Sequence, residues 1–210
     1  MTSARTRARL AQTLRAAGIR DERVLAAMQA VPRHVFIEEA LASRAYEDVT
    51  LPIGFGQTIS RPYTVALATQ TLVEGRMPGR VLEVGTGCGY QAAVLGRIAG
   101  EVFTLERIHV LHLRSRDALF GLDVRNVRCR FGDGNRGWPE HAPYDGILLS
   151  ASPPEIPETL LAQLAVNGRL VAPVGLNRSQ RLQIVTRSGR GFERREVSGA
   201  YFVPMQNGVA

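Results

Sequence analysis

The sequence has few of the residues that form covalent cross-links and no stretch that could cross a membrane. Cysteine occupies only two of the 210 positions, Cys88 and Cys129, so neither a disulfide framework nor a metal site is indicated. No apolar run approaches the roughly 20 residues needed to span a bilayer, and none resembles the core of a secretory signal. We therefore expect a cytoplasmic protein with no membrane partner.

Histidine is also scarce and forms no catalytic pattern. The four histidines, His34, His109, His112 and His141, lack the spacing of metal ligands. No Ser/His/Asp arrangement can be recognised in the sequence. We expect no metal, and neither a hydrolase nor a metalloenzyme.

The length and the charge favour one basic globular domain. The chain of 210 residues can build one domain of three packed layers but is too short for two full enzyme domains. Its net charge of +7 could indicate a nucleic-acid-binding protein. The arginines are nevertheless spread along the sequence, and no motif of an RNA-binding module is present. We expect a monomer with a solvated basic surface, tolerant of acidic substrates and without a specific nucleic-acid partner.

Short apolar runs that alternate with helical segments predict the fold class from residue 80 onward. The predicted strands cover residues 80–84, 101–105, 127–131, 146–150 and 169–174, and the predicted helices lie near 90–99, 108–120 and 157–165. This alternation is typical of an α/β fold with a doubly wound, mostly parallel sheet of the Rossmann-like type. An antiparallel hairpin is expected at the C-terminal end, formed by residues 182–186 and 192–197.

Helical periodicity also precedes the sheet. Helices are expected over residues 4–17 and 21–30, and another from Thr64 to Leu72. Residues 46–62 are rich in Gly and Pro, so we expect a long ordered loop there. The chain is interpreted as one domain in three parts: a helical extension with a loop over 1–75, a core over 78–176, and a hairpin with a tail over 177–210.

Three glycines follow the first strand of the predicted sheet, in the stretch VLEVGTGCGY at residues 81–90. Gly85, Gly87 and Gly89 would let a ligand approach the backbone N–H groups at a helix start, where side chains would block it. Their G-x-G-x-G spacing differs from the G-x-G-x-x-G of dinucleotide-binding proteins, so the pattern does not require a pyrophosphate.

Acidic residues stand at the ends of neighbouring strands. We expect the carboxylate of Glu106, at an exposed strand end, to accept both hydroxyls of a ribose, and Asp133 to accept a hydrogen bond from an adenine amino group. A surface glutamate and a turn aspartate are the structural alternatives. Because the carboxyl ends of parallel strands meet at one edge, these residues and Glu83 would share one crevice. Adenosine without pyrophosphate points to S-adenosyl-L-methionine.

Several motifs, in their order and spacing, resemble the protein-L-isoaspartate O-methyltransferase family. They extend from about residue 30 to 204 and read VPRHVF, GQTISRPYTVA, VLEVGTGCGYQAAVL, LERI, GDGNRGW, APYDGILLSA, GRLVAPVG and FVP. The Q-T-I-S-x-P segment is specific to that family rather than to methyltransferases in general.

The resemblance implies methyl transfer from S-adenosyl-L-methionine to the α-carboxylate of L-isoaspartyl residues in damaged proteins and peptides. It further implies that the loop 56–62 folds over the cofactor, with Ser60 as the catalytic residue near the transferred methyl group. The structural alternative for Ser60 is an N-cap of the helix that follows Pro62. The residues implied to bind the cofactor are Ile59, Ser60, Glu83, Gly85, Thr86, Gly87, Gly89, Glu106, Arg107, Asp133 and Gly134.

Two departures from the family pattern border the expected substrate cleft. Arg61 stands where the family commonly has glutamine, and LLSASPP at 148–154 replaces a more usual alanine-rich segment. Two alternative functions stay open at this point. One is a methyltransferase of the same fold that acts on RNA or a small molecule, favoured by the basic charge. The other is a non-catalytic adenosine-binding module.

Overall fold

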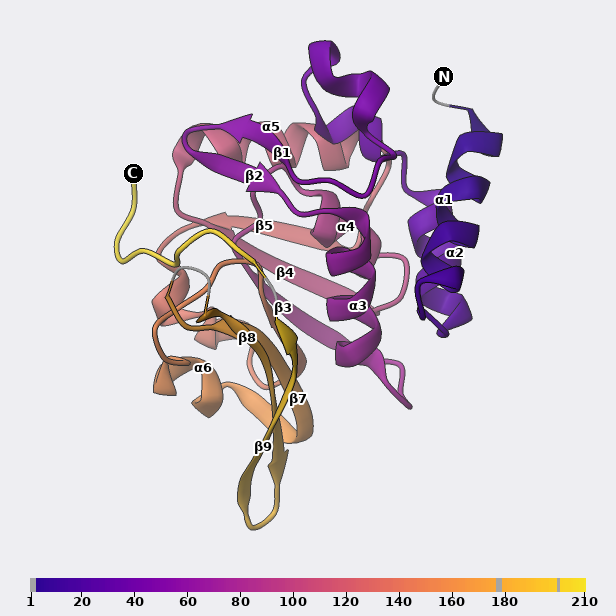
Figure 1. Ribbon diagram of the computed structural model, residues 1–210. Coiled ribbons are helices and arrows are strands. Elements are labelled where there is room, and N and C mark those ends of the chain that lie inside the picture. The colour runs from indigo at the N-terminus through magenta and orange to yellow at the C-terminus, as the bar shows by residue number, and fades with distance from the viewer. Residues whose placement is uncertain (1–2, 177–178, 200) are drawn as a thin grey trace.

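Figure 1 shows the computed structural model, which describes residues 3–176, 179–199 and 201–210. Its central sheet has seven strands in the order β5-β4-β3-β6-β7-β8-β9. Neighbouring strands are parallel from β5 across to β7, and β8 and β9 continue the sheet in antiparallel fashion. The strands are β3 (Arg80–Val84), β4 (Glu101–Glu106), β5 (Val127–Phe131), β6 (Tyr144–Leu149), β7 (Leu164–Val174), β8 (Arg181–Ser188) and β9 (Gly191–Gly199).

Helices cover both faces of the sheet. The α-helices are α1 (Ala4–Ala16), α2 (Glu22–Ala30), α3 (Pro62–Val73), α4 (Tyr90–Leu95), α5 (His109–Gly121) and α6 (Glu158–Ala162). Short 3-10 turns occupy Arg33–Phe36, Glu39–Arg44, Gly134–Arg136 and Pro139–His141. The mostly parallel sheet, its helices and the C-terminal hairpin confirm the predicted fold class.

The alternation of side chains along each strand produces two hydrophobic cores. In β3, Val81 belongs to the core that includes residues of α3, α4 and α5, whereas its neighbour Leu82 belongs to the core on the α6 side. Val102 and Phe103 of β4 divide in the same way. Because both faces are covered, the inner strands consist almost entirely of buried residues, as expected for a parallel sheet.

The N-terminal helices form a hairpin beside α3 (Figure 1). The Ser3 side chain accepts a hydrogen bond from the Thr6 N–H at the start of α1, and Asp21 caps α2 by accepting from the Arg23 N–H. Both helices therefore begin at residues suited to satisfy their free N–H groups.

The expected long loop over residues 46–62 contains a hairpin that the sequence prediction missed. Its strands are β1 (Leu51–Gly54) and β2 (Gln57–Ile59), and they pair antiparallel. Three consecutive residues make the turn in the left-handed region, since Gly54, Phe55 and Gly56 have φ values of 88°, 55° and 67°. The glycines that suggested a loop thus form the tight turn of a short hairpin.

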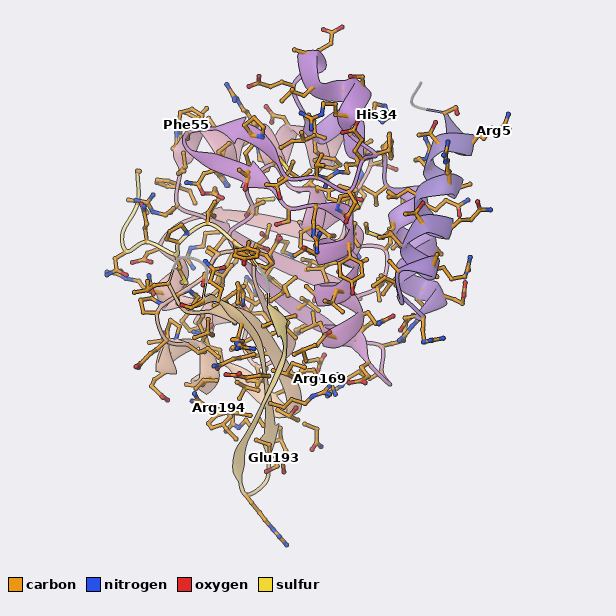
Figure 2. The ribbon with its side chains drawn as sticks, in the orientation of Figure 1. Arg5, His34, Phe55, Arg169, Glu193 and Arg194 are labelled. Atoms are coloured by element: carbon orange, nitrogen blue, oxygen red, sulfur yellow. The ribbon has the colours of Figure 1, made fainter. Side chains whose placement is uncertain are left out.

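The arginine side chains labelled in Figure 2 belong to separate elements, with Arg5 on α1, Arg169 on β7 and Arg194 on β9. Arg5 on α1 and Arg194 on β9 lie at distant ends of the view. Within the part of the chain that the structure describes, no helix is long and apolar enough to cross a membrane.

Candidate active site

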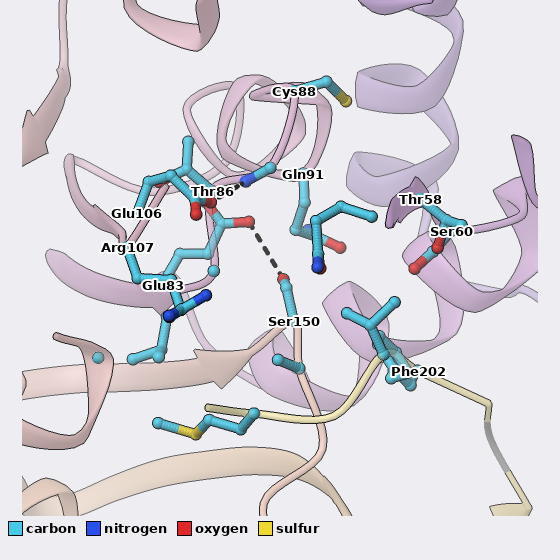
Figure 3. A pocket seen from close by; sticks show the side chains of 18 of the residues that line it. Thr58, Ser60, Glu83, Thr86, Cys88, Gln91, Glu106, Arg107, Ser150 and Phe202 are labelled. Atoms are coloured by element: carbon cyan, nitrogen blue, oxygen red, sulfur yellow. Dashed lines mark hydrogen bonds between the residues drawn. The ribbon is translucent and has the colours of Figure 1, made fainter. Parts of the chain in front are cut away.

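A cavity lies at the carboxyl edge of the sheet, where the prediction placed the site (Figure 3). The loop after β3, the ends of β4 and β6, strand β2 and the C-terminal tail contribute its walls. Of the predicted site residues, those that line it are Ile59, Ser60, Glu83, Gly85, Thr86, Gly87, Glu106, Arg107 and Gly134. Gly89 and Asp133 are outside this lining.

The glycine loop turns sharply between β3 and α4. Gly85, Gly87 and Gly89 have φ values of 96°, 54° and 95°, a backbone region that residues with a Cβ rarely adopt. The N–H groups of Gly85 and Thr86 both donate to the carbonyl oxygen of Leu105, which fastens the loop to β4. Gly85 and Gly87 thereby present bare backbone to the cavity.

Gly89 has a different structural reason to be glycine. A Cβ there would lie 3.2 Å from the Cβ of Ser115, so the glycine permits close packing of the loop against α5. This packing explains why position 89 requires glycine even when no ligand is considered. The contact of Gly89 with the cofactor stays a prediction.

Glu106 is buried, so the expectation that it lies at an exposed strand end is wrong, and so is the alternative of a surface glutamate. Only 5% of its surface is accessible, and backbone groups bond to both of its carboxylate oxygens. Oε2 accepts from the Gly87 N–H at 2.7 Å and Oε1 from the Ile108 N–H at 2.9 Å. Burial raises the pKa of Glu106, and these hydrogen bonds oppose the rise. Each oxygen retains a second lone pair that could receive a ribose hydroxyl.

We expect Glu106→Ala to weaken S-adenosyl-L-methionine binding by roughly 1.5 to 3 kcal/mol, since hydrogen bonds to a charged acceptor are lost. The variant should also melt at a lower temperature, because the Gly87 and Ile108 N–H groups lose their partner. Calorimetric titration and thermal unfolding measure the two effects. Glu101→Ala, at the opposite end of β4, is the matched control and should bind normally. Unchanged affinity of folded Glu106→Ala would remove this residue from the site.

Glu83 is fully buried at the floor of the cavity and belongs to a chain of hydroxyl groups. Thr104 donates to Glu83 Oε2 at 2.6 Å. Ser150 donates to Glu83 Oε1 at 3.2 Å, the contact drawn in Figure 3. Because the Thr104 proton is used in this way, Thr86 donates to Thr104, 2.6 Å away. Burial raises the pKa of Glu83 to about 8, against the effect of the two hydroxyl donors.

The raised pKa predicts a pH dependence of stability. The folded protein holds a proton on Glu83 that the unfolded chain releases near pH 4.5, so the free energy of unfolding should fall as the pH rises from about 4.5 to 8. The slope from one group is at most about 1.4 kcal/mol per pH unit. Urea unfolding at several pH values should show this slope reduced in Glu83→Gln but not in Glu155→Gln, which removes an exposed carboxyl. Equal slopes in all three proteins would contradict the assignment.

Asp133 is directed to the C-terminal tail. Its Oδ1 accepts from the Asn135 N–H at 2.9 Å, and its Oδ2 accepts from the Gly208 N–H at 2.9 Å. Burial raises the pKa of Asp133, but hydrogen bonds from Gly208 and Asn135 outweigh it, so the pKa is lowered overall. The neighbouring Gly134 does line the cavity, where a Cβ would overlap the Val84 side chain. The contact of Asp133 with adenine stays a prediction.

The tail crosses the edge of the sheet and closes one side of the cavity. Ser152 and the tail exchange backbone hydrogen bonds, from the Ser152 N–H to Val203 and from the Met205 N–H to Ser152, each 2.8 Å long. Further along, Arg107 Nε donates to the Gly208 carbonyl oxygen at 3.1 Å. The residues of the tail that line the cavity are Phe202, Val203, Pro204, Met205 and Gln206.

Ile59, the last residue of β2, and Ser60, which follows it, line a further part of the cavity wall. Ser60 is half-buried, and its hydroxyl has no hydrogen-bond partner among the residues that the structure describes. It does not cap α3: the N-cap is Arg61, and the Tyr63 N–H bonds to Asp48 Oδ1 at 2.8 Å. The capping alternative for Ser60 is therefore wrong.

Sequence analysis did not assign several other lining residues. They include Thr58, Cys88, Gln91, Ser150 and the five residues of the tail. The sequence contained two indications of these residues. The motif FVP near the end of the chain contains part of the tail, and the segment LLSASPP contains Ser150. No group of three or more His, Cys, Asp or Glu side chains that could hold a metal occurs in the described ranges.

The fold and this site together define a nucleoside-binding α/β protein of the methyltransferase type. A family model described as protein-L-isoaspartate(D-aspartate) O-methyltransferase matches residues 5–210. The chain therefore belongs to the protein-L-isoaspartate(D-aspartate) O-methyltransferase family.

Individual relatives with high sequence identity carry the same family name. A protein-L-isoaspartate O-methyltransferase of Halorhodospira halophila is 56% identical over 208 residues, which is 99% of this chain and 94% of that protein. One from Marinobacter nauticus is 52% identical over 209 residues, covering 100% of this chain and 95% of the relative.

Solved structures show the same similarity. One protein-L-isoaspartate O-methyltransferase has a TM-score of 0.86 at 28% identity, and the match covers 96% of this chain and 66% of that one. A structure from Plasmodium falciparum, titled as a methyltransferase of the same name in complex with S-adenosyl-L-homocysteine, has a TM-score of 0.83 at 27% identity. That match covers 95% of this chain and 98% of the other.

Proposed function

We propose that this protein repairs damaged proteins by methylating them. It transfers the methyl group of S-adenosyl-L-methionine to the α-carboxylate of L-isoaspartyl residues in proteins and peptides. The observation that carries this proposal is that the family's Q-T-I-S segment and the glycine loop line one cavity, so that Ser60 and Gly85 face a common space. In a methyltransferase for RNA or small molecules, the Q-T-I-S segment would have no such role.

The residues of the cavity fit the cofactor. Gly85 and Gly87 offer backbone without side chains, and Glu106 has spare lone pairs for a ribose. Glu83 provides a buried carboxyl group, which would ionise beside a cationic ligand. S-adenosyl-L-methionine, when bound, supplies a methyl group on a positively charged sulfur. We propose that these four residues hold it.

The protein contributes alignment rather than proton transfer. A substrate carboxylate has a pKa near 4 in water, so it is already ionised at neutral pH and needs no general base. Ser60 would donate a hydrogen bond that orients this carboxylate. Fixing the reacting groups in line can contribute about 7 to 11 kcal/mol in favourable cases. The hairpin and the tail would exclude water from the carboxylate. The methyl ester formed would close to a succinimide with loss of methanol, and hydrolysis of the succinimide by water would give normal aspartate in part.

The experiment that tests the function compares three substrates. Release of S-adenosyl-L-homocysteine is measured with an L-isoaspartyl peptide, with the same peptide containing aspartate, and with RNA. We expect release with the first substrate alone. Release with RNA would favour the alternative methyltransferase, and tight cofactor binding without release on any substrate would favour a binding module.

We also infer that the protein acts as a cytoplasmic monomer and binds no specific nucleic acid. The spread of arginines over distant parts of the molecule supports this proposal (Figure 2). Light scattering at micromolar concentration should give the mass of a single 22.9 kDa chain.

A further inference from the structure

Gln91 extends from the first turn of α4 into the cavity, and neither the glycine motif nor the Q-T-I-S segment accounts for it. Figure 3 places it between Glu83 and Ser60, in the centre of the site. Its side chain is half-buried and makes one hydrogen bond with the described part of the chain, from Nε2 to Thr69 Oγ1 of α3 at 2.9 Å. A polar side chain in this position can contact a bound substrate.

The contact with Thr69 fixes which end of the amide faces the cavity. Thr69 is fully buried, and its Oγ1 lies 2.8 Å from the carbonyl oxygen of Val65. Two oxygens at that distance repel unless a proton lies between them, so the Thr69 hydroxyl donates to Val65. Thr69 can then only accept a hydrogen bond from Gln91, so the NH2 group of the Gln91 amide faces Thr69. Gln91 Oε1 is left as an acceptor with no partner among the residues that the structure describes.

We propose that Gln91 Oε1 accepts a hydrogen bond from the backbone N–H of the isoaspartyl residue, and that Thr69 is the positioning residue that aims it. An amide oxygen cannot bind the substrate carboxylate, because both are acceptors. The cationic part of the cofactor has a better partner in the buried carboxyl of Glu83, which a bound cation would hold in its ionised form. The neutral N–H of the substrate is the donor that matches a neutral acceptor.

This contact would distinguish isoaspartate from aspartate. In isoaspartate the free carboxylate and the N–H are attached to the same carbon. In aspartate one further methylene separates them, a displacement of about 1.5 Å. With Ser60 holding the carboxylate and Gln91 holding the N–H, only the isoaspartyl arrangement satisfies both residues. The inference rests on the proposed function, since it assumes an isoaspartyl substrate.

The first experiment combines a protein variant with a modified substrate. One peptide contains L-isoaspartate, and a second replaces its N–H by an ester oxygen, which removes the donor. For the unaltered protein we expect kcat/KM to be roughly 2- to 10-fold lower on the ester, the loss expected for one neutral hydrogen bond. Gln91→Met should show the lower value on both peptides and no longer distinguish them. If Gln91→Met still distinguishes them as the unaltered protein does, the proposal is overturned.

The second experiment tests the role of Thr69. Thr69→Val keeps the shape but cannot accept from Gln91, so we expect a several-fold rise in KM for the isoaspartyl peptide, with unchanged cofactor affinity by calorimetry. Thr69→Ser retains a hydroxyl and should restore KM. In the Gln91→Met background, Thr69→Val should have no further effect on KM. A rise in KM that persists in that background would overturn the positioning role.

Cofactor affinity tests one further possibility, that Gln91 binds the cofactor and not the substrate. If Gln91→Met weakened cofactor binding by the same factor as it lowered kcat/KM, the donor would be the cofactor ammonium group and the proposal would be wrong. Absence of methylation of the isoaspartyl peptide by the unaltered protein would instead refute the proposed function itself.

Discussion

Gly85→Val is expected to abolish S-adenosyl-L-methionine binding. Gly85 has φ of 96°, and its Cβ would point toward the end of β6, 3.6 Å from the Ser150 carbonyl carbon. That space is tolerable for a single carbon, but the two methyl groups of valine would extend into the cavity that Gly85 lines. The left-handed backbone adds strain for any residue with a Cβ, and most for a branched one.

Two further variants make this prediction specific. Gly85→Ala carries the backbone strain with only one added carbon, so it should bind the cofactor measurably but more weakly than the unaltered protein. Gly189→Val alters the turn between β8 and β9, where a Cβ has no neighbour within 4 Å, and should bind normally. Calorimetric titration gives the affinities, and circular dichroism shows which variants fold. Normal affinity of folded Gly85→Val would mean that the glycine loop faces another ligand or none.

The parts of this site that could be predicted from the sequence depend on local signals. Gly85 follows a short apolar strand and precedes a helix, a pattern that places bare backbone at the carboxyl edge of a parallel sheet. Glu106 ends the next strand, so it comes to the same edge regardless of details elsewhere. Its burial was not predictable, because it depends on the Gly87 and Ile108 N–H groups that turn toward its carboxylate.

Other parts depend on contacts between distant residues. Asp133 bonds to the Gly208 N–H, 75 positions along the chain, and no local pattern indicates that the tail would return to this edge. The orientation of Gln91 likewise requires that Thr69 on another helix lie beside it. The β1–β2 hairpin was missed because its strands have only four and three residues and Phe55 adopts a positive φ that few non-glycine residues take.

The structure strengthens the case for a functional role of Ser60. A capping serine would bond to an N–H group at the start of α3, but Asp48 bonds to the Tyr63 N–H there. The Ser60 hydroxyl instead lines the cavity, and it makes no hydrogen bond within the described part of the chain. Within the described part of the chain, no histidine or acidic side chain is hydrogen-bonded to Ser60 that would make it a nucleophile. A hydrogen-bond donor for the substrate carboxylate is the role that remains.

Ser60→Ala should therefore lower kcat on an isoaspartyl peptide on the order of 10²-fold, while the dissociation constant for S-adenosyl-L-methionine changes little. A donor that acts chiefly in the transition state affects kcat, whereas one that only holds the cofactor affects its affinity. Ser188→Ala removes a hydroxyl that bonds to the turn between β8 and β9 and is the control, with kcat unchanged. No covalent methyl- or acyl-enzyme should accumulate in either protein, because the ionised carboxylate is itself the nucleophile. If Ser60→Ala kept its kcat, the carboxylate would have to be oriented by another group, and Thr58 on the adjoining strand β2 would be the next residue to replace.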